Sequence, residues 1–365
     1  MLVSYQWLCE YVNLDAYSVD EIRQTLTHLG LEVESMTTFK PYQGQVVVAE
    51  IIEHAKMPDS DKLSVCKVKY GKDQTAQIVC GAANAKKGMK TALALPGAEL
   101  PNGLKIAKGK IRNTPSEGMM CSDAELGFGT DASGIKELNA KAPIGADLAE
   151  YCKMIDTVFE IKLTPNRADC LGHFGIARDL AAKLGLELMI PEQKGKSTPS
   201  LKSDAKIKIE IKNPDLCPRF TALYVKGLEA KLSPTWLQNR LRAVGQRPIN
   251  LIVDVTNYVM LEYSQPIHAY DLRDIKGQTI LVKEAKNGDK FQTLDVIERA
   301  LRAEDITISD ASGPIGLAGV MGGLNSEVKD DTHEVIIEVA CFDPAQIRKT
   351  SKHFGLHTEA SHRFE

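Results

Sequence analysis

Apolar and polar residues follow two different periods along the chain, and the period changes near Gln45. Before it, in residues 1–40, a helical pattern starts at a capping box formed by Ser18 and Glu21, and Gly30 marks its end. After it come successive β-rich runs separated by proline, glycine and aspartate: VVVAEIIEHA, LSVCKVKYG, TAQIVCGAA, MKTALALPG and LKIAKGKIR. Five strands this closely spaced predict a small closed β-barrel.

A helical pattern returns in residues 151–190. There the motif TPNRADCLG forms a turn into a helix near Phe174, and Gly185 ends that helix. We expect this helix to pack beside the first one, so that residues 1–40 and 151–190 form one split α/β domain. The barrel, residues 41–150, is then an insertion in that domain.

The second half of the chain is predicted to be a larger α+β region. It follows residues 191–204, which have the composition of a linker. Residues 205–365 contain strand patterns at 220–225, 280–284 and 334–340 and a helix after Ser233. The sequence stops at Glu365 without a terminating signal, so we interpret this region as truncated at its C-terminal end. The predicted class is therefore α+β, with several domains.

Composition is that of an ordinary globular protein, with 43% hydrophobic and 25% charged residues. The net charge of −3 means that any nucleic-acid site must be local. Eight cysteines without a CxxC spacing indicate reduced thiols. The N-terminus has no basic region and no apolar run reaches about 18 residues. We therefore expect a cytoplasmic protein without a membrane partner.

A local excess of positive charge lies in the predicted barrel. From Lys86 to Arg112 there are seven basic residues and one acid, Glu99. This stripe fits a contact to a phosphate backbone, and the alternative is a solvated barrel face. Few aromatic residues lie in the barrel, so base stacking is not expected to dominate. The candidate nucleic-acid contacts are Lys86, Lys87, Lys108, Lys110 and Arg112.

A glycine-rich stretch precedes a strand with a single charge. Five glycines occur within residues 313–323, among apolar residues, which indicates close approach of the backbone to another group. The strand at 335–340 is apolar except for Glu338, and alternation places Glu338 on the same face as Ile336 and Ala340. We favour a pocket in which this carboxylate binds a specific group over a solvated edge.

Several standard chemistries are excluded by spacing. A phosphate-binding loop has four residues between its glycines, whereas Gly103 and Gly109 are separated by five. His353 and His357 have no third ligand after them, so we expect no metal site. His268, with Asn257 eleven positions before it in the sequence, fits either a satisfied core cluster or the rim of a site. Taken singly, the core interpretation is favoured.

Taken together, these motifs resemble the β subunit of bacterial phenylalanyl-tRNA synthetase. HAKMPDSDKL, VCGAAN and SEGMMCS resemble its tRNA-binding OB-fold module, and TPNRADCLG matches the segment after it. RPINLIVDVTNYVMLEYSQPIHAYD, GLAGVMGG, IIEVACFDP and LHTEASHRFE resemble its B3/B4 editing domain. One departure is Ser264, where the family usually has glycine.

The resemblance implies a subunit that works with an α subunit in a heterotetramer (α2β2). That enzyme joins phenylalanine to tRNA(Phe) with ATP and magnesium, and its aminoacylation site is on the α subunit. This part of the β subunit is implied to bind tRNA and to hydrolyse mischarged Tyr-tRNA(Phe). We expect neither ATP nor Mg²⁺ to bind to it.

The resemblance also assigns the residues of the editing pocket. An editing pocket must reward the tyrosine hydroxyl, and Glu338 is the expected acceptor, left unpaired when phenylalanine binds. The alternatives are a tRNA-binding module without hydrolytic activity and a purely structural subunit. The catalytic residues implied are His268, Glu338 and Thr358, and the substrate-binding residues are Asn257, Ala318, Gly322 and Ala360.

Overall fold

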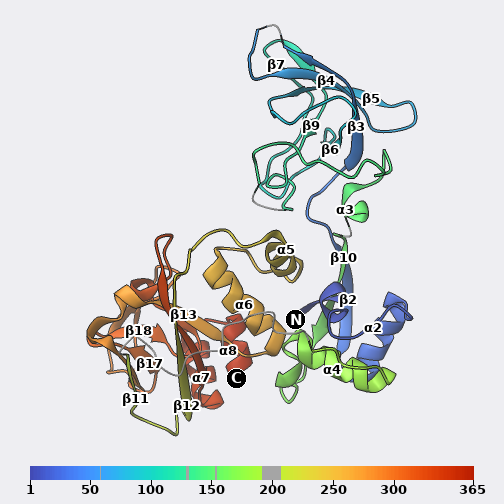
Figure 1. The fold of residues 1–365 in the computed structure, drawn as a ribbon. Helices are drawn as coiled ribbons and strands as arrows, with labels where there is room; N and C mark the ends of the chain where they lie inside the picture. Colours follow the sequence, from blue (N-terminus) through green and yellow to red (C-terminus); the bar gives the residue numbers. More distant parts are fainter. Residues whose placement is uncertain (58, 129–130, 153, 191–206) are drawn as a thin grey trace.

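The computed structural model describes residues 1–57, 59–128, 131–152, 154–190 and 207–365. Figure 1 shows a barrel at one end of the molecule, joined by two chain segments to a larger body that holds both termini. The predicted linker, residues 191–204, lies outside the described residues. None of the described helices is both long and apolar enough to cross a membrane.

The N-terminal domain forms one sheet from segments on both sides of the barrel. Its elements are β1 (Leu2–Ser4), α1 (Tyr5–Leu8), α2 (Val19–His28), β2 (Glu32–Phe39), β10 (Asp156–Lys162), η1 (Ala168–Cys170) and α4 (His173–Leu184). Strand β10 lies between β1 and β2 and pairs antiparallel with both. Side chains from the helices, among them Trp7 and Leu26, share one buried core with Phe159. The capping box of Ser18 and Glu21 forms as predicted.

Two helices from the second half of the chain join this core. They are α5 (Thr235–Ala243) and α6 (Leu251–Tyr263). Leu237, Leu241 and Leu261 lie in the same buried cluster as Trp7. Helix α6 begins at the cap Asn250, whose side chain accepts hydrogen bonds from two backbone N–H groups. The core of the split domain therefore includes residues from the predicted 205–365 region.

The inserted barrel is a curled antiparallel sheet of five strands. Its elements are β3 (Val46–Lys56), β4 (Ser64–Lys69), β5 (Thr75–Cys80), β6 (Lys90–Ala94), β7 (Gly109–Ile111), β8 (Thr114–Ser116), β9 (Met119–Met120) and α3 (Leu148–Tyr151). The sheet order is β5–β4–β3–β6–β9, and its two edge strands contact each other. Central strand β3 shifts register between Ile51 and Glu53, which bends it. Successive residues of β3 point to opposite faces of the sheet. Val48 packs in the apolar cluster on one side, and Val47 packs in the cluster on the other side.

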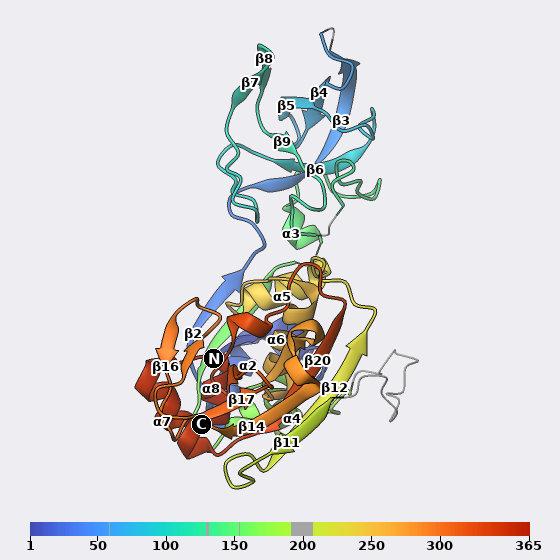
Figure 2. The same cartoon turned by 90° about the vertical axis from the view of Figure 1, so that its left-hand side faces the viewer.

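The prediction that LKIAKGKIR supplies a barrel strand is wrong. Most side chains of this run are exposed, and only Ile106 is buried. The run instead leads into the separate β7–β8 hairpin, and β9 takes the fifth place in the sheet. Figure 2 shows this hairpin standing beside the barrel. A run with this many lysines has no apolar face to bury against the sheet.

The C-terminal region contains two main sheets that share a core. Its elements are β11 (Lys208–Ile211), β12 (Arg219–Lys226), β13 (Ile267–Asp271), η2 (Leu272–Asp274), η3 (Lys276–Gln278), β14 (Thr279–Glu284), β15 (Lys290–Gln292), β16 (Glu298–Ala300), β17 (Ile306–Ser309), β18 (Pro314–Leu317), β19 (Met321–Gly322), η4 (Leu324–Ser326), β20 (Glu334–Cys341), α7 (Pro344–Phe354) and α8 (Glu359–Phe364). The sheet orders are β12–β20–β13 and β11–β14–β17–β18–β19. Tyr270, Ile308 and Ile336 bring both sheets into one buried cluster. The predicted α+β class with an inserted barrel is confirmed.

Candidate functional site

A cavity of about 550 Å³ opens between α6, strands β13 and β20, the β18–β19 hairpin and the start of α8. Of these elements, α6, β13, β18 and α8 are labelled in Figure 1. The structure brings to its wall every pocket residue that the sequence singled out. These residues are Asn257, His268, Ala318, Gly322, Glu338, Thr358 and Ala360.

The register of the three-stranded sheet places the polar side chains of the cavity together. Glu338 on β20 is paired with His268 on β13 and with Ala222 on β12. Directly opposite residues of antiparallel strands point to the same face, and so do residues two apart. His268, Tyr270 and Glu338 therefore share one face, and the small side chain of Ala222 leaves room beside the carboxyl group.

The glycine-rich hairpin forms the opposite wall because its backbone can approach these side chains. A Cβ atom on Gly322 would lie 2.6 Å from Cε1 of His268, and one on Gly316 would lie 3.2 Å from the hydroxyl of Tyr270. Gly319, at the turn between β18 and β19, has a φ of +67°. A side chain at any of these positions would push the wall away from the polar group or strain the turn.

Glu338 is buried and has a single side-chain partner among the described residues. The hydroxyl of Tyr270 donates to its Oε2 at 2.5 Å. Burial raises the pKa of Glu338 to about 7, and the hydrogen bond from Tyr270 opposes that rise. The other oxygen, Oε1, accepts no hydrogen bond from the described residues. The sequence did not identify Tyr270 as a partner of Glu338, and its bond leaves one oxygen of the carboxyl group as the open acceptor.

His268 is a neutral side chain at the same face. Burial lowers its pKa to about 4, so the imidazole carries no charge near pH 7. Its Nε2 atom is buried and has no hydrogen-bond partner among the described residues. The ring meets that of Tyr270 edge-on, with centroids 4.5 Å apart. His268 lines the cavity, and a buried nitrogen without a partner is a group that a bound water or a polar ligand atom would satisfy.

Thr358 is engaged in local structure. It caps α8: its hydroxyl donates to the carbonyl of Val320 at 2.9 Å and accepts from the N–H of Ser361 at 3.0 Å. These bonds join α8, which carries Ala360, to the glycine-rich hairpin. On the other side, Asn257 lies on α6, and its side-chain amide has no hydrogen bond to the described residues. Asn257 can therefore contact a ligand directly, whereas Thr358 holds two walls together.

The cavity wall carries three carboxyl groups, and only one of them has a cationic partner among the described residues. Besides Glu338 it includes Glu327 and Glu359, and its described lining contains no lysine or arginine. Glu359 forms an ion pair with Arg363 at 2.6 Å, and Glu327 has no ion-pair partner in the described part of the chain. Such a site favours a cationic or neutral ligand over an anionic one.

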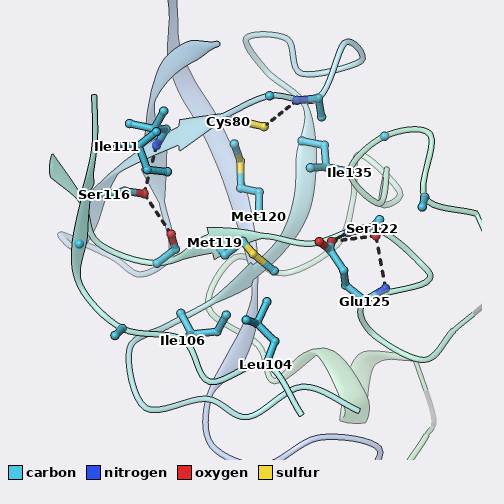
Figure 3. Close-up of a pocket in the computed structure, with 18 of the residues that line it drawn as sticks. Cys80, Leu104, Ile106, Ile111, Ser116, Met119, Met120, Ser122, Glu125 and Ile135 are labelled. Atoms are coloured by element: carbon cyan, nitrogen blue, oxygen red, sulfur yellow. Dashed lines mark hydrogen bonds between the residues drawn. The ribbon is translucent and has the colours of Figure 1, made fainter. Parts of the chain in front are cut away.

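A second cavity, of about 600 Å³, lies in the barrel domain (Figure 3). Apolar side chains of Leu104, Ile106 and Met119 line it, and Figure 3 shows Glu125 beside Ser122 at one side. Ser122 donates to that carboxylate through both its N–H and its hydroxyl, each at 2.7 Å. Of the predicted tRNA contacts, only Lys110 borders this cavity.

Several basic residues of the stripe between Lys86 and Arg112 already form ion pairs, so fewer positive charges are available to a phosphate backbone than the seven basic residues suggest. Three of its lysines have carboxylate partners, namely Lys86 with Glu137, Lys105 with Glu99 and Lys108 with Glu117, at 3.1–3.5 Å. No carboxylate of the described residues pairs with Lys87, Lys110 or Arg112. Lys108, Lys110 and Arg112 come together at the β7–β8 hairpin, whereas Lys86 and Lys87 lie between β5 and β6.

One acidic cluster outside both cavities has the spacing of a metal site. It consists of Asp169, Cys170 and Asp179. Arg167 donates to both carboxylates, and Arg178 donates to them as well. Arg167 lowers the pKa of Asp169 to about 2, whereas burial raises that of Cys170 to about 12. A protonated thiol among arginine-paired carboxylates is a structural network and a poor metal ligand set.

Two parts of the chain match models of known protein families. Residues 216–365 match the B3/4 domain, and residues 46–147 match the putative tRNA binding domain. The phenylalanine–tRNA ligase β subunit of Geobacter sulfurreducens is 47% identical over 365 residues, which is 100% of this chain and 45% of that protein. The same subunit of Bdellovibrio bacteriovorus is 46% identical over 366 residues, with the same two shares. The chain thus spans about half the length of these relatives.

Among solved structures, an N-terminal fragment of the phenylalanyl-tRNA synthetase β-subunit from Pyrococcus horikoshii matches with 19% identity. The match covers 51% of this chain and 56% of that chain, with a TM-score of 0.30. The two domain matches confirm the predicted tRNA-binding barrel and B3/B4 region. They coincide with the two parts of the chain that contain the two cavities.

Proposed function

Because the chain belongs to the family of phenylalanine–tRNA ligase β subunits, we propose that it forms the tRNA-binding and editing part of such a subunit. The editing reaction is hydrolysis of tyrosine from mischarged Tyr-tRNA(Phe). The complete ligase, a cytoplasmic heterotetramer of two α and two β subunits, would charge tRNA(Phe) with phenylalanine using ATP and magnesium. The α subunit would hold that aminoacylation site.

The observation that carries this proposal is the buried carboxyl of Glu338 at the wall of the 550 Å³ cavity. A cavity of this size holds a tyrosyl group. Oε1 of Glu338 offers an acceptor for a phenolic hydroxyl, and apolar residues such as Met260 and Ala318 line the space for the ring. A phenylalanyl group would leave that buried acceptor without a partner, which costs about 1–3 kcal/mol.

The charge of the cavity supports an aminoacyl ester as the substrate in preference to a free amino acid. A free amino acid carries a carboxylate, and the described lining offers no lysine or arginine to pair with it. In an aminoacyl-tRNA this carboxylate is esterified and neutral, and only the ammonium charge remains. The carboxylate of Glu327, which has no ion-pair partner in the described part of the chain, suits that ammonium group.

The hydrolytic step then requires a water molecule near the ester carbonyl. The water oxygen bonds to the carbonyl carbon, the bond from that carbon to the ribose oxygen breaks, and a proton given up by the water passes to the ribose oxygen. His268 suits the role of holding this water, because its imidazole lines the cavity, is neutral, and has an Nε2 atom without a hydrogen-bond partner among the described residues. Asn257 would bind the ester group, and Thr358 would position Ala360 and the hairpin.

The barrel would supply the tRNA contact. Lys110 and Arg112, on the β7–β8 hairpin, have no carboxylate partner among the described residues, and Lys110 borders the apolar cavity of Figure 3. Lys87 is equally free of carboxylate partners in the described chain. Lys86 and Lys108 would contribute less, because each already pairs with a glutamate.

The test of this function is deacylation of Tyr-tRNA(Phe) by the complete ligase and by this chain alone. We expect the complete ligase to release tyrosine much faster than phenylalanine from the same tRNA. Equal release of the two amino acids, at the uncatalysed rate, would rule out the editing function. Aminoacylation with phenylalanine serves as the check that the enzyme is assembled.

A further inference from the structure

Tyr270 is a buried residue at the wall of the cavity, and the hydrolytic step proposed above gives it no role. Its side chain is 2% exposed, and its hydroxyl donates to Oε2 of Glu338 at 2.5 Å. Building on the proposed editing function, we propose that Tyr270 is a specificity-determining positioning residue. It occupies one oxygen of Glu338 and so leaves only Oε1 to accept the hydroxyl of a tyrosyl substrate.

The sheet and the hairpin fix this arrangement. Tyr270 lies two residues after His268 on β13, opposite Ile336, so its ring is on the face that carries Glu338. The hydroxyl reaches the carboxyl group because Gly316, on the facing hairpin, has no side chain: a Cβ there would lie 3.2 Å from it. The edge-on contact with His268 limits rotation of the ring. The carboxyl group is therefore held in one orientation by a donor that is itself fixed.

The same hydrogen bond controls the charge of Glu338. Among the described residues Tyr270 is the only side chain that donates to this carboxyl group. The other titratable groups around it are His268 on β13, Cys217 before β12, and Glu327 and Glu359 on the cavity wall. Since none of these is a cation near neutral pH, the phenol of Tyr270 is the principal group that opposes protonation of the buried carboxylate.

An ionised carboxyl group with one free oxygen can only accept at that oxygen. It therefore binds a ligand that donates a hydroxyl more tightly than a ligand without one. Without the hydroxyl of Tyr270, both oxygens would face empty space, and a water molecule could take the vacated place. The carboxyl group would also hold its proton to higher pH, which turns it into a donor as well. Both changes weaken discrimination between tyrosine and phenylalanine.

The test is Tyr270→Phe in the complete ligase, with deacylation of Tyr-tRNA(Phe) and Phe-tRNA(Phe) measured from about pH 5.5 to 8.5. The ratio of the two values of kcat/KM cancels the pH dependence of the ester itself. We expect the ratio to fall by about tenfold near pH 7 and its midpoint to move upward by about one pH unit. In a Glu338→Gln background the ratio should show no midpoint in this pH range, with or without Tyr270→Phe.

Tyr224→Phe is the matched control. It removes a phenol that donates to Glu334 at 2.7 Å on the same sheet, away from the cavity. We expect the control to keep both the ratio and the midpoint of the wild type. If Tyr270→Phe does the same while the wild type edits, Tyr270 has no role in discrimination. If the wild type itself fails to deacylate Tyr-tRNA(Phe), the proposed editing function is wrong, and the role of Tyr270 in it is wrong as well. Unchanged charging with phenylalanine shows that each variant is folded.

Discussion

His268 and Glu338 lie directly opposite each other on the neighbouring antiparallel strands β13 and β20. Burial acts on both side chains, but with opposite effects on their pKa values. It lowers that of His268 to about 4 and raises that of Glu338 to about 7. Near neutral pH the pair therefore consists of a neutral imidazole and a carboxyl group close to its titration midpoint. These states suit the holding of water and the recognition of a hydroxyl group.

The first prediction concerns His268. His268→Ala should slow deacylation of Tyr-tRNA(Phe) by roughly 10²-fold, the low end of the contribution of a positioned acid–base group, because the water loses its partner. Charging with phenylalanine should be unaffected. With a pKa of about 4, His268 is already neutral above pH 5, so the rate should show no transition near pH 6.5 from this residue. Isolation of a covalent acyl-histidine would contradict the role of holding water.

The second prediction concerns the basic hairpin of the barrel. Lys110→Gln should weaken tRNA(Phe) binding and reduce the slope of log affinity against log salt by about one. Lys108→Gln is the matched control on the same hairpin, where the charge is already paired with Glu117 at 3.1 Å. Its effect should be smaller. Binding titrations at several salt concentrations measure both, and equal affinity of wild type and Lys110→Gln at low salt would exclude the contact.

The third prediction concerns the barrel as an insertion. Phe39 and Asp156 are paired residues of β2 and β10, so a short turn can connect these strands directly. Replacing residues 41–154 with a short glycine-containing turn should leave a folded remainder, because the β1–β10–β2 sheet keeps all its strands. One contact that would be lost is the hydrogen bond from Asn239 to the carbonyl of Gly127, at 3.0 Å. Circular dichroism should show a cooperative thermal transition, and a molten or insoluble product would argue against the insertion.

The fourth prediction concerns Ser264, which ends α6 in the left-handed conformation with a φ of +64°. This conformation costs a non-glycine residue about 1–2 kcal/mol, which is a physical reason for the glycine that the resemblance leads us to expect at this position. The hydroxyl of Ser264 donates to the carbonyl of Asp169 at 3.2 Å and offsets part of that cost. Ser264→Gly should therefore be more stable than Ser264→Ala by about 1 kcal/mol. Urea unfolding compares the two, and equal midpoints would contradict the backbone argument.

Local features of the structure could be predicted from the sequence, whereas cross-strand partners could not. The capping box at Ser18 and the stop at Gly185 depend on neighbouring residues, and both form. The face shared by Ile336 and Glu338 follows from strand alternation alone. Tyr270 lies two positions after His268 in the sequence, yet its bond to Glu338 depends on the register of two distant strands.

Two further features needed long-range information. Helix α6 is not evident from the sequence pattern, because its residues are apolar on most sides and show no helical period. The one local signal is Asn250, a helix-capping residue before the apolar run. The charge of the barrel was overestimated because Glu117 and Glu137, which neutralise Lys108 and Lys86, lie outside the basic stretch in sequence. The fold determines which charged side chains form ion pairs. A count of charges within one stretch of sequence does not include partners from outside that stretch.

The most direct measurement is the ratio of deacylation rates for Tyr-tRNA(Phe) and Phe-tRNA(Phe) in Glu338 variants of the complete ligase. A charged acceptor of a hydroxyl contributes about 1.5–3 kcal/mol, so Glu338→Ala should lower the ratio by about 10- to 100-fold. Glu338→Gln should be intermediate, because its carbonyl still accepts. The wild-type ratio should rise with pH through about 7, as the carboxyl group ionises, and that rise should vanish in both variants. Charging with phenylalanine should remain intact. If Glu338→Ala keeps the wild-type ratio, the phenol is recognised elsewhere and the assignment of Glu338 is wrong.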